Sequence, residues 1–352
     1  MYKEVFMNCT KLTDFNFESL IYVGPYAFTN TGFTSVELPV FTNFTNNGAF
    51  SGCKSLTKVS IPLVTGIFSS TFDGCILLSD IYAPNVTNIG MQAFRSTIIP
   101  KVDETIFPLI TSIPASCFTY NSAISIVSHP SITSVGNAAF ASCSSLTTVN
   151  LPALSSINGT AFAYTGITEI NLSLLSSIPI SCFYSCKSLT SVSLGTGNIT
   201  LSQGAFLESP LLSEITNLSY VTNLGYGALQ GTALSEINLP NLATMSTSGN
   251  NFMNNSQLQT VSLGGTFGKI QKSAFANCPL LTSLYLLNTD AIIQLNSSAA
   301  NVFNSSPLKP GGLDGVYGSI YVPAALYNNY LANASWAAIE TSHPGTFVSI
   351  TT

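Results

Sequence analysis

A pattern of apolar and polar positions, about 22 residues long, repeats along the chain. In residues 139–162, AFASCSSLTTVNLPALSSINGTAF, the apolar Val149 and Leu151 enclose the polar Asn150, as in a short strand with one buried face. A further apolar point, Ile157, follows, and the phrase opens and closes on Ala-Phe. Each repeat is therefore predicted to contain a strand, a turn, a second inward point and a closing Phe.

The closing aromatic residue recurs at nearly constant spacing. Neighbouring members lie 21 to 24 residues apart until the last interval, which is 28 residues. The members are Phe6, Phe28, Phe50, Phe72, Phe94, Phe118, Phe140, Phe162, Phe183, Phe206, Leu229, Phe252, Phe275 and Phe303. A period of this length is typical of solenoid proteins, in which each coil buries its apolar face against its neighbours.

The strand phrase has the form L-x-x-V-x-L and recurs in phase with the aromatic residue. Examples are FTSVELP (33–39), LTKVSIP (56–62), LTTVNLP (146–152), LSEINLP (234–240) and LQTVSL (258–263). Stacked coils would place these strands side by side. We therefore expect a β-rich repeat solenoid of about fourteen coils with one long parallel sheet.

The L-x-x-V-x-L-P strand, the T-x-I turn and the A-F-x-x-C closure resemble those of the BspA-like leucine-rich repeats, also found in Treponema surface proteins. The resemblance covers nearly the whole chain. It implies a right-handed leucine-rich-repeat superhelix with a non-enzymatic role in surface recognition or adhesion. We expect the solenoid to occupy residues 1–317, and a closing strand with a short helical cap to occupy residues 318–352. Trp336, the only tryptophan, is expected to pack within that cap.

The N-terminal end shows no comparable cap. Phe6 falls in the closing phrase of a coil whose earlier part is missing, so an upstream domain or a partner chain is expected to cover this edge. The start, MYKEVFMNCTKL, lacks a basic region followed by an apolar one. Two interpretations stay open: either the protein is not exported by a secretory signal, or the start was cut from a longer chain.

Composition narrows the class of partner. Charged residues make up 7% of the chain, against roughly 25% in ordinary globular proteins, and the net charge is −5. The 10 basic residues are scattered, so we expect no nucleic-acid partner, because phosphate binding needs clustered Lys and Arg. No apolar run approaches the roughly 18–20 residues that span a membrane, so no membrane insertion is expected.

Cysteine and histidine could carry chemistry, but their positions favour structural roles. Six of the eight cysteines follow a repeat Phe by three residues: Cys9, Cys53, Cys75, Cys143, Cys186 and Cys278. This fixed phase predicts free, buried thiols, although Cys53 and Cys75, on neighbouring coils, could bridge. Cys182 and Cys186 lack the companions of a zinc site, so no metal or cofactor is expected. His129 falls at an inward position and is predicted to be a neutral, hydrogen-bonded core residue.

Two columns of outward residues are the candidate binding site. The first column holds the residue before the central inward position of each strand; its acidic members are Asp14, Asp80, Glu104, Glu169, Glu214 and Glu236. The second column holds the residue after that position and includes Tyr82, Asn150, Asn171, Asn238 and Tyr285. Asp80 with Glu104, and Glu214 with Glu236, are expected side by side on neighbouring coils. The columns either form a solvated face or recognise a glycan or a protein.

The sequence thus predicts a non-enzymatic module, with no catalytic residue, that binds a protein or glycan on a host or cell surface. A first alternative is a receptor-binding protein of a phage tail, so the expected location is extracellular, on a bacterial or a virion surface. A second alternative is a polysaccharide-degrading enzyme on a parallel β-helix, which would need paired carboxylates such as Glu214 and Glu236. Such a site usually carries basic and aromatic residues around the sugar, and the acidic column lacks them.

Overall fold

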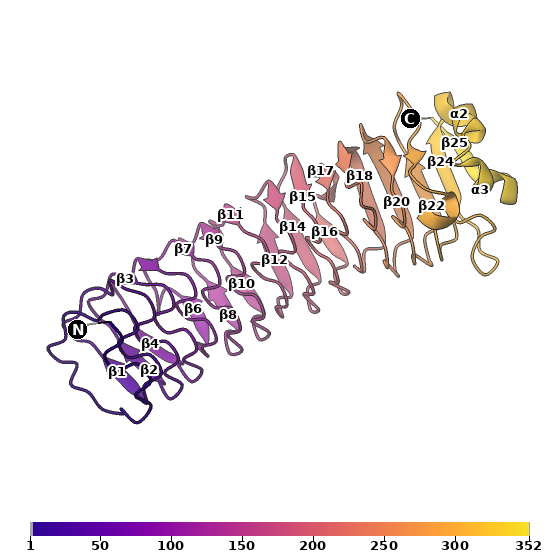
Figure 1. Cartoon of the computed structure of the whole chain (residues 1–352). Helices are drawn as coiled ribbons and strands as arrows, with labels where there is room; N and C mark the ends of the chain where they lie inside the picture. Colours follow the sequence, from indigo (N-terminus) through magenta and orange to yellow (C-terminus); the bar gives the residue numbers. More distant parts are fainter. Residues whose placement is uncertain (1–2, 352) are drawn as a thin grey trace. The chain divides into compact units, whose positions relative to one another are not determined.

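The computed structural model describes residues 3–351 and is a parallel β-solenoid of about fourteen turns (Figure 1). The predicted solenoid class, the predominance of strands and the small C-terminal helical part are confirmed. The chain divides into two compact units, Met1–Asn171 and Leu172–Thr352.

In the first unit, six coils each contribute a three-residue strand, and these strands form two three-stranded sheets whose outer faces are open to solvent. The strands pair in parallel and in register, so that Val59 lies between Val36 and Ile81. Two sheets of three result: β1 (Ser35–Glu37), β2 (Lys58–Ser60) and β4 (Asp80–Tyr82), then β6 (Lys101–Asp103), β8 (Ile126–Ser128) and β10 (Thr148–Asn150). The central residues of the first five strands are buried, as the alternating pattern predicts, and Val149 of β10 is half-buried.

The T-x-I phrase forms a second series of shorter parallel strands in the same unit. These are β3 (Gly66–Ile67) with β5 (Asn88–Ile89), and β7 (Ser112–Ile113), β9 (Ser134–Val135) and β11 (Ser156–Ile157). Ile113, Val135 and Ile157 are buried. Each coil therefore has two hydrogen-bonded sides that direct apolar residues into one core.

The repeat phenylalanines form a continuous stack inside the first unit. From Phe28 to Phe162, neighbouring ring centroids lie between 5.2 and 5.9 Å apart, and the ring planes are within 12° of parallel. All of these side chains are fully buried. The predicted closing residue of each coil is thus the central column of the core.

The turn that carries each Phe has an unusual backbone. The residues two positions before and after Phe118, Ser116 and Tyr120, have φ of 54° and 62°, in the left-handed region. The Phe118 amide donates to the carbonyl oxygen of Ala139 in the next coil at 2.9 Å. Similar pairs of left-handed residues flank most other repeat aromatics, and Gly48 and Gly52 take these places around Phe50. The left-handed residues thus allow the backbone of the turn to hydrogen-bond to the next coil, on a third side of each coil besides its two strands.

The second unit continues the same architecture with longer strands. Its main strands are β14 (Ser191–Leu194), β16 (Glu214–Thr216), β18 (Glu236–Leu242), β20 (Thr260–Gly265), β22 (Ser283–Leu286), β24 (Ser319–Pro323) and β25 (Phe347–Ile350). Strands β18, β20, β22, β24 and β25 pair in this order as a five-stranded parallel sheet. The strand β12 (Glu169–Leu172) spans the boundary between the units in the sequence.

A second series of strands accompanies the main one in this unit. It consists of β13 (Ser177–Ile178), β15 (Ile199–Leu201), β17 (Val221–Leu224) and β19 (Thr244–Met245), followed by the pair β21 (Lys269–Ile270) and β23 (Gln294–Leu295). The aromatic stack also continues, with Phe275 between Phe252 and Phe303 at 5.1 and 5.5 Å. Leu229 fills the same buried place where the series lacks a Phe.

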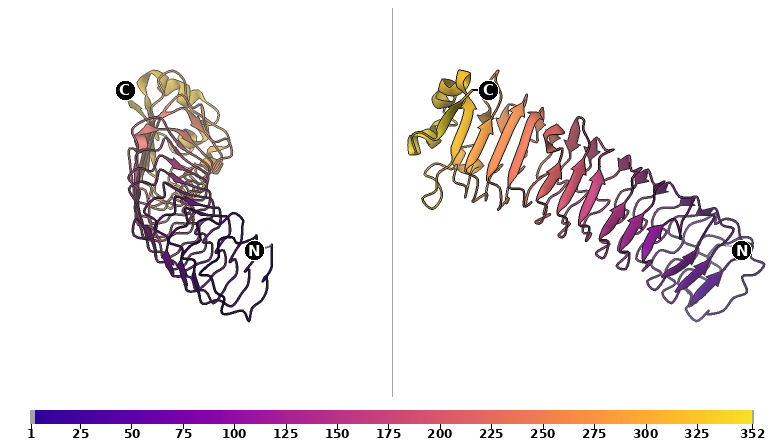
Figure 2. Two further views of the ribbon diagram at one scale, coloured as in Figure 1. Left: turned by 90° about the vertical axis from the view of Figure 1, so that its left-hand side faces the viewer. Right: turned by 180° about the vertical axis from the view of Figure 1, so that it is seen from behind.

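Short helices close the C-terminal end of the second unit (yellow in Figure 2). They are the 3-10 turn η2 (Ala324–Leu326), α2 (Tyr327–Ala332) and α3 (Ala337–Ser342). The short helix α1 (Ala299–Val302) lies earlier, in the turn before Phe303. Trp336 and Tyr330 are fully buried; the Trp336 indole N–H donates to the carbonyl oxygen of Ile293 at 2.8 Å, and the Tyr330 hydroxyl accepts from the Ile293 amide at 2.9 Å. Trp336 thus packs within the cap as predicted, and its ring centroid also lies 6.1 Å from that of Phe303, the last member of the aromatic stack.

The thiols and the histidine occupy mainly the predicted environments. Cys53, Cys75, Cys143 and Cys278 are free and buried, and each Sγ donates to the carbonyl oxygen of a repeat Phe at 3.1 Å. Cys9 is exposed, so the prediction of a buried thiol was wrong for this residue. Its coil lies at the end of the stack. His129 is buried; its Nε2 lies 3.0 Å from the Phe107 carbonyl oxygen, and its Nδ1 accepts from the Ser131 amide.

Candidate functional site

The strand pairing fixes the two outward columns in the second unit. Across β18, β20, β22 and β24, the first column consists of Glu236, Thr260, Ser283 and Ser319, and the second of Asn238, Ser262, Tyr285 and Tyr321. All eight side chains are exposed or half-buried. Because the strands are in register, these columns form a flat surface of hydroxyls, amides and phenols on a rigid sheet.

In the first unit, the first column has mixed charge and is not an acidic strip. Strand β2 places Lys58 beside Asp80, with Nζ 4.0 Å from Oδ2 and both side chains at least half exposed. An exposed ion pair of this kind contributes roughly 0–1 kcal/mol. In the second column, Tyr82 is 56% exposed and Asn150 is also exposed.

Glu104 is not in the first column, so this prediction was wrong. It lies in a turn after β6, and the register of β6 with β8 places Lys101 in the first column and Asp103 in the second. The cause is an irregular coil. Val102 follows Phe94 by 8 residues and precedes Phe118 by 16, whereas Val127 follows Phe118 by 9 and precedes the next Phe by 13. Asp80 and Glu104 are therefore not a side-by-side pair of first-column carboxylates.

Asp103, which sequence reasoning did not single out, organises this irregular turn. Its carboxylate lies 2.6 Å from Lys101 Nζ and accepts hydrogen bonds from the amide and hydroxyl of Thr105 at 3.0 and 2.6 Å. Burial opposes ionisation of Asp103, but the hydrogen bonds from Lys101 and Thr105 outweigh it and lower the pKa of this carboxyl. Asp103 is thus a structural residue that stabilises the longer turn.

Glu214 and Glu236 lie on successive main strands, but the sheet is interrupted between them. Strand β16 pairs with β14 and not with β18, and the 3-10 turn η1 (Leu218–Tyr220) follows β16 directly. Both glutamates line one cavity of about 340 Å³, together with Ser235 and Asn238. The structure therefore brings the two carboxylates to one polar groove and leaves both exposed.

The remaining predicted residues, Glu169 and Asn171, are the outward residues of β12. Both are exposed, while Ile170 and Leu172 between and after them are buried. Glu169 and Asn171 therefore point outward, as the pattern predicts for the first and the second column.

The most distinctive feature of the exposed surface is a pair of stacked tyrosines. The rings of Tyr285 and Tyr321 lie with centroids 4.2 Å apart and planes 8° from parallel. Sequence reasoning found Tyr285 but missed Tyr321, which was assigned to the closing segment. The phrase SIYVP (319–323) has the same alternation as the repeat strand phrase, and this signal could have identified Tyr321.

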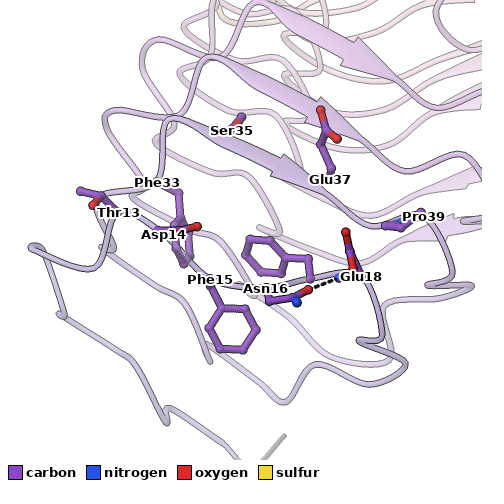
Figure 3. Close-up of a pocket in the computed structure, with 10 residues that line it drawn as sticks. Thr13, Asp14, Phe15, Asn16, Glu18, Phe33, Ser35, Glu37 and Pro39 are labelled. Carbon is purple, nitrogen blue, oxygen red and sulfur yellow. Dashed lines mark hydrogen bonds between the residues drawn. The ribbon is translucent and has the colours of Figure 1, made fainter.

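At the N-terminal coil, the columns line a second polar hollow of about 500 Å³. Figure 3 shows Asp14 and Asn16 on the segment beside Ser35 and Glu37, in the arrangement that the two columns predict. The Asn16 side chain accepts a hydrogen bond from the Glu18 amide at 2.9 Å, so part of its polarity stabilises the local turn.

Two kinds of site are not found in the part of the chain that the structure describes. Within residues 3–351, no group of three or more His, Cys, Asp and Glu side chains is placed to hold a metal ion. In the same residues, no helix is long and apolar enough to cross a membrane.

The stacked strands, the aromatic column and the polar outer face together define a leucine-rich-repeat solenoid. The sequence matches the model of the BspA type leucine rich repeat region in six copies, over residues 1–125, 111–231 and 176–309. The chain therefore belongs to the BspA-type leucine-rich repeat family.

Several solved structures are similar to the chain. A leucine-rich repeat protein from Bacteroides ovatus is 19% identical, with a TM-score of 0.47, and the match covers 72% of this chain and 87% of that one. A leucine rich cell surface protein from Faecalibacterium prausnitzii is 22% identical, with a TM-score of 0.44 and coverage of 78% and 90%. The pneumococcal vaccine antigen PcpA is 12% identical, with a TM-score of 0.40 and coverage of 91% and 89%. No curated protein matches the sequence.

Proposed function

We propose that this chain is a non-enzymatic recognition module that binds a protein or a glycan at a cell or virion surface through the exposed face of its main strands. The observation that carries the proposal is the pair of registered columns on β18 to β24, which present hydroxyl, amide and phenol groups on a rigid sheet. Because strand pairing already fixes the backbone of this surface, binding a partner costs little backbone conformational entropy.

The low charge of the chain supports the same function. With 7% charged residues, long-range electrostatic attraction contributes little to binding, and short-range hydrogen bonds and aromatic contacts determine specificity. A flat polar surface of this kind suits a ligand that offers many hydroxyl or amide groups. Membership of a family of repeat solenoids favours binding over catalysis.

A labelled form of the protein tests the proposal when it is applied to glycan and protein arrays, to bacterial cells and to epithelial cells. The native protein should bind at least one of these surfaces, and a heat-unfolded sample should not. Binding confined to bacterial cells would favour a receptor-binding role on a virion, whereas binding to epithelial cells would favour an adhesin. Release of reducing ends from a polysaccharide, lost on Glu214→Gln, would contradict the non-enzymatic proposal.

A further inference from the structure

The stacked tyrosines stand beside shorter polar residues on the five-stranded sheet; the strip that runs from Tyr285 across β20 to Asn238 and Glu236 is called the trough below. Tyr321 of β24 covers one face of the Tyr285 ring at a centroid distance of 4.2 Å. The other face of Tyr285 is turned toward β20, where the neighbouring second-column residue is Ser262. Because a serine is much shorter than a tyrosine, the Ser262 side chain is too small to cover the whole of this aromatic face.

The floor and the opposite wall of the trough are polar. Thr260 and Ser262 of β20 form the floor, and Glu236 and Asn238 of β18 form the opposite wall. Parallel strands lie about 4.8 Å apart, so β22 and β18 are separated by about 9.6 Å. Two van der Waals contacts of about 3.5–4 Å each fit within this width, which leaves room for one saccharide ring standing between the walls.

Electrostatics are consistent with the closeness of the two walls. Partial burial raises the pKa of Tyr285, and the neighbouring Tyr321 and the negative charge of Glu236 raise it further. The carboxylate of Glu236 is thus near enough to influence the phenol of Tyr285.

The chemistry of the trough matches a neutral sugar. One face of a pyranose presents C–H groups of slight positive charge, which are attracted to the negative face of an aromatic ring. Its hydroxyls need donors and acceptors, and the amide of Asn238, the carboxylate of Glu236 and the hydroxyl of Ser262 supply both. The eight column residues on β18 to β24 include no Lys or Arg, so the surface offers nothing to an anionic sugar.

We infer that this trough holds one neutral hexose unit of a glycan, with its C–H face against Tyr285 and its hydroxyls on Asn238, Glu236 and Ser262. The inference rests on the proposed function and specifies its ligand class and its position. Tyr321 acts as a positioning residue, because it holds the Tyr285 ring upright from behind.

The experiment uses the full chain with two probes, an array of neutral oligosaccharides and the methyl glycosides of glucose, galactose and mannose in saturation-transfer NMR. At least one neutral probe should bind. Tyr285→Ala should weaken binding by about ten-fold or more, whereas Tyr285→Phe, which keeps the ring, should stay within about three-fold of the native protein. Tyr120→Ala is the matched control, because Tyr120 is an exposed tyrosine in a repeat turn, outside both columns of the main strands, and it should leave binding unchanged.

Thermal unfolding of each variant separates loss of binding from loss of folding, and Asn238→Ala provides a second test on the opposite wall if Tyr285→Ala fails to fold. Unchanged binding in both Tyr285→Ala and Asn238→Ala would overturn the inference. Binding of a surface protein without any neutral glycan would overturn the inference and leave the proposed function standing. Failure to bind any array or cell would contradict both.

Discussion

The rings of Phe118 and Phe140 lie 5.5 Å apart and 3° from parallel, so each coil places its phenylalanine directly over that of its neighbour. Both side chains are fully buried. Removal of one ring therefore opens a cavity that faces two neighbouring rings, and the backbone ladders on three sides of the coil limit the collapse that could fill it.

Phe140→Ala is expected to lower the free energy of unfolding by about 3–5 kcal/mol, the usual cost of deleting a buried aromatic side chain. The matched control is Phe6→Ala. Phe6 stacks only on Phe28 within its column and is partly exposed, so its loss should cost clearly less. Urea denaturation followed by circular dichroism measures both. Equal and small effects would show that the aromatic column does not stabilise the core.

Ala138→Gly is expected to stabilise the protein by up to about 1 kcal/mol. Ala138 has φ of 53°, and glycine adopts this left-handed conformation without the steric cost of a Cβ atom. Ala141→Gly, three residues away on the same turn and similarly half-buried, should destabilise the protein, because glycine there gains only unfolded-state entropy. Melting temperatures of the two variants should shift in opposite directions; a decrease for both would argue against strain at the flanking positions.

Native protein treated with iodoacetamide at pH 9 should react first at Cys9. Cys9 is exposed, whereas burial raises the pKa of Cys143 and of Cys278 to about 12. These buried thiols therefore stay protonated and shielded at pH 9, and the thiolate is the reactive form. Intact-mass spectrometry should show that Cys143 and Cys278 are modified only after denaturation. Rapid labelling of Cys143 in the native state would contradict the burial of this thiol.

Replacing Glu214 and Glu236 together by Gln should weaken surface attachment without loss of stability. Both carboxylates line the groove between β16 and β18, where like charges repel each other in the absence of a ligand. The double variant should unfold at the same urea concentration as the native protein or at a slightly higher one. Attachment to the surface found for the native protein is measured in parallel. Full attachment would show that this groove is only solvated.

Much of the fold follows from the period of the sequence. A repeat of 21 to 24 residues with one Phe and one L-x-x-V-x-L phrase leaves few alternatives to a solenoid, because no single repeat can bury its own apolar face. The inward position of His129 followed from the same phase, and the packing of Trp336 within the cap followed from the apolar side of the closing segment; both residues are buried.

The errors arose where the phase changes. Glu104 was misplaced because its coil has one residue fewer between the repeat Phe and the strand, and three residues more after the strand, than the next coil. The interruption between β16 and β18 depends on η1, which no spacing rule indicated. The left-handed turn residues were missed because Ser, Asn, Tyr and Ala occupy positions where glycine would have been a signal. Tyr321 was missed because the central residue of its strand, Ile320, follows Phe303 by 17 residues, whereas the equivalent Leu284 follows Phe275 by 9.

Blocking the outer face of the main strands shows whether the partner binds there. Ser262→Trp places a large side chain on the floor of the trough, and Ser177→Trp places the same side chain on the outward position of β13, in the second series of strands of the same unit. Attachment of both variants to the native protein's target is measured by flow cytometry or on the array, with melting temperature as the check on folding. Ser262→Trp should abolish attachment and Ser177→Trp should retain it; native attachment by a folded Ser262→Trp variant would show that the partner binds elsewhere.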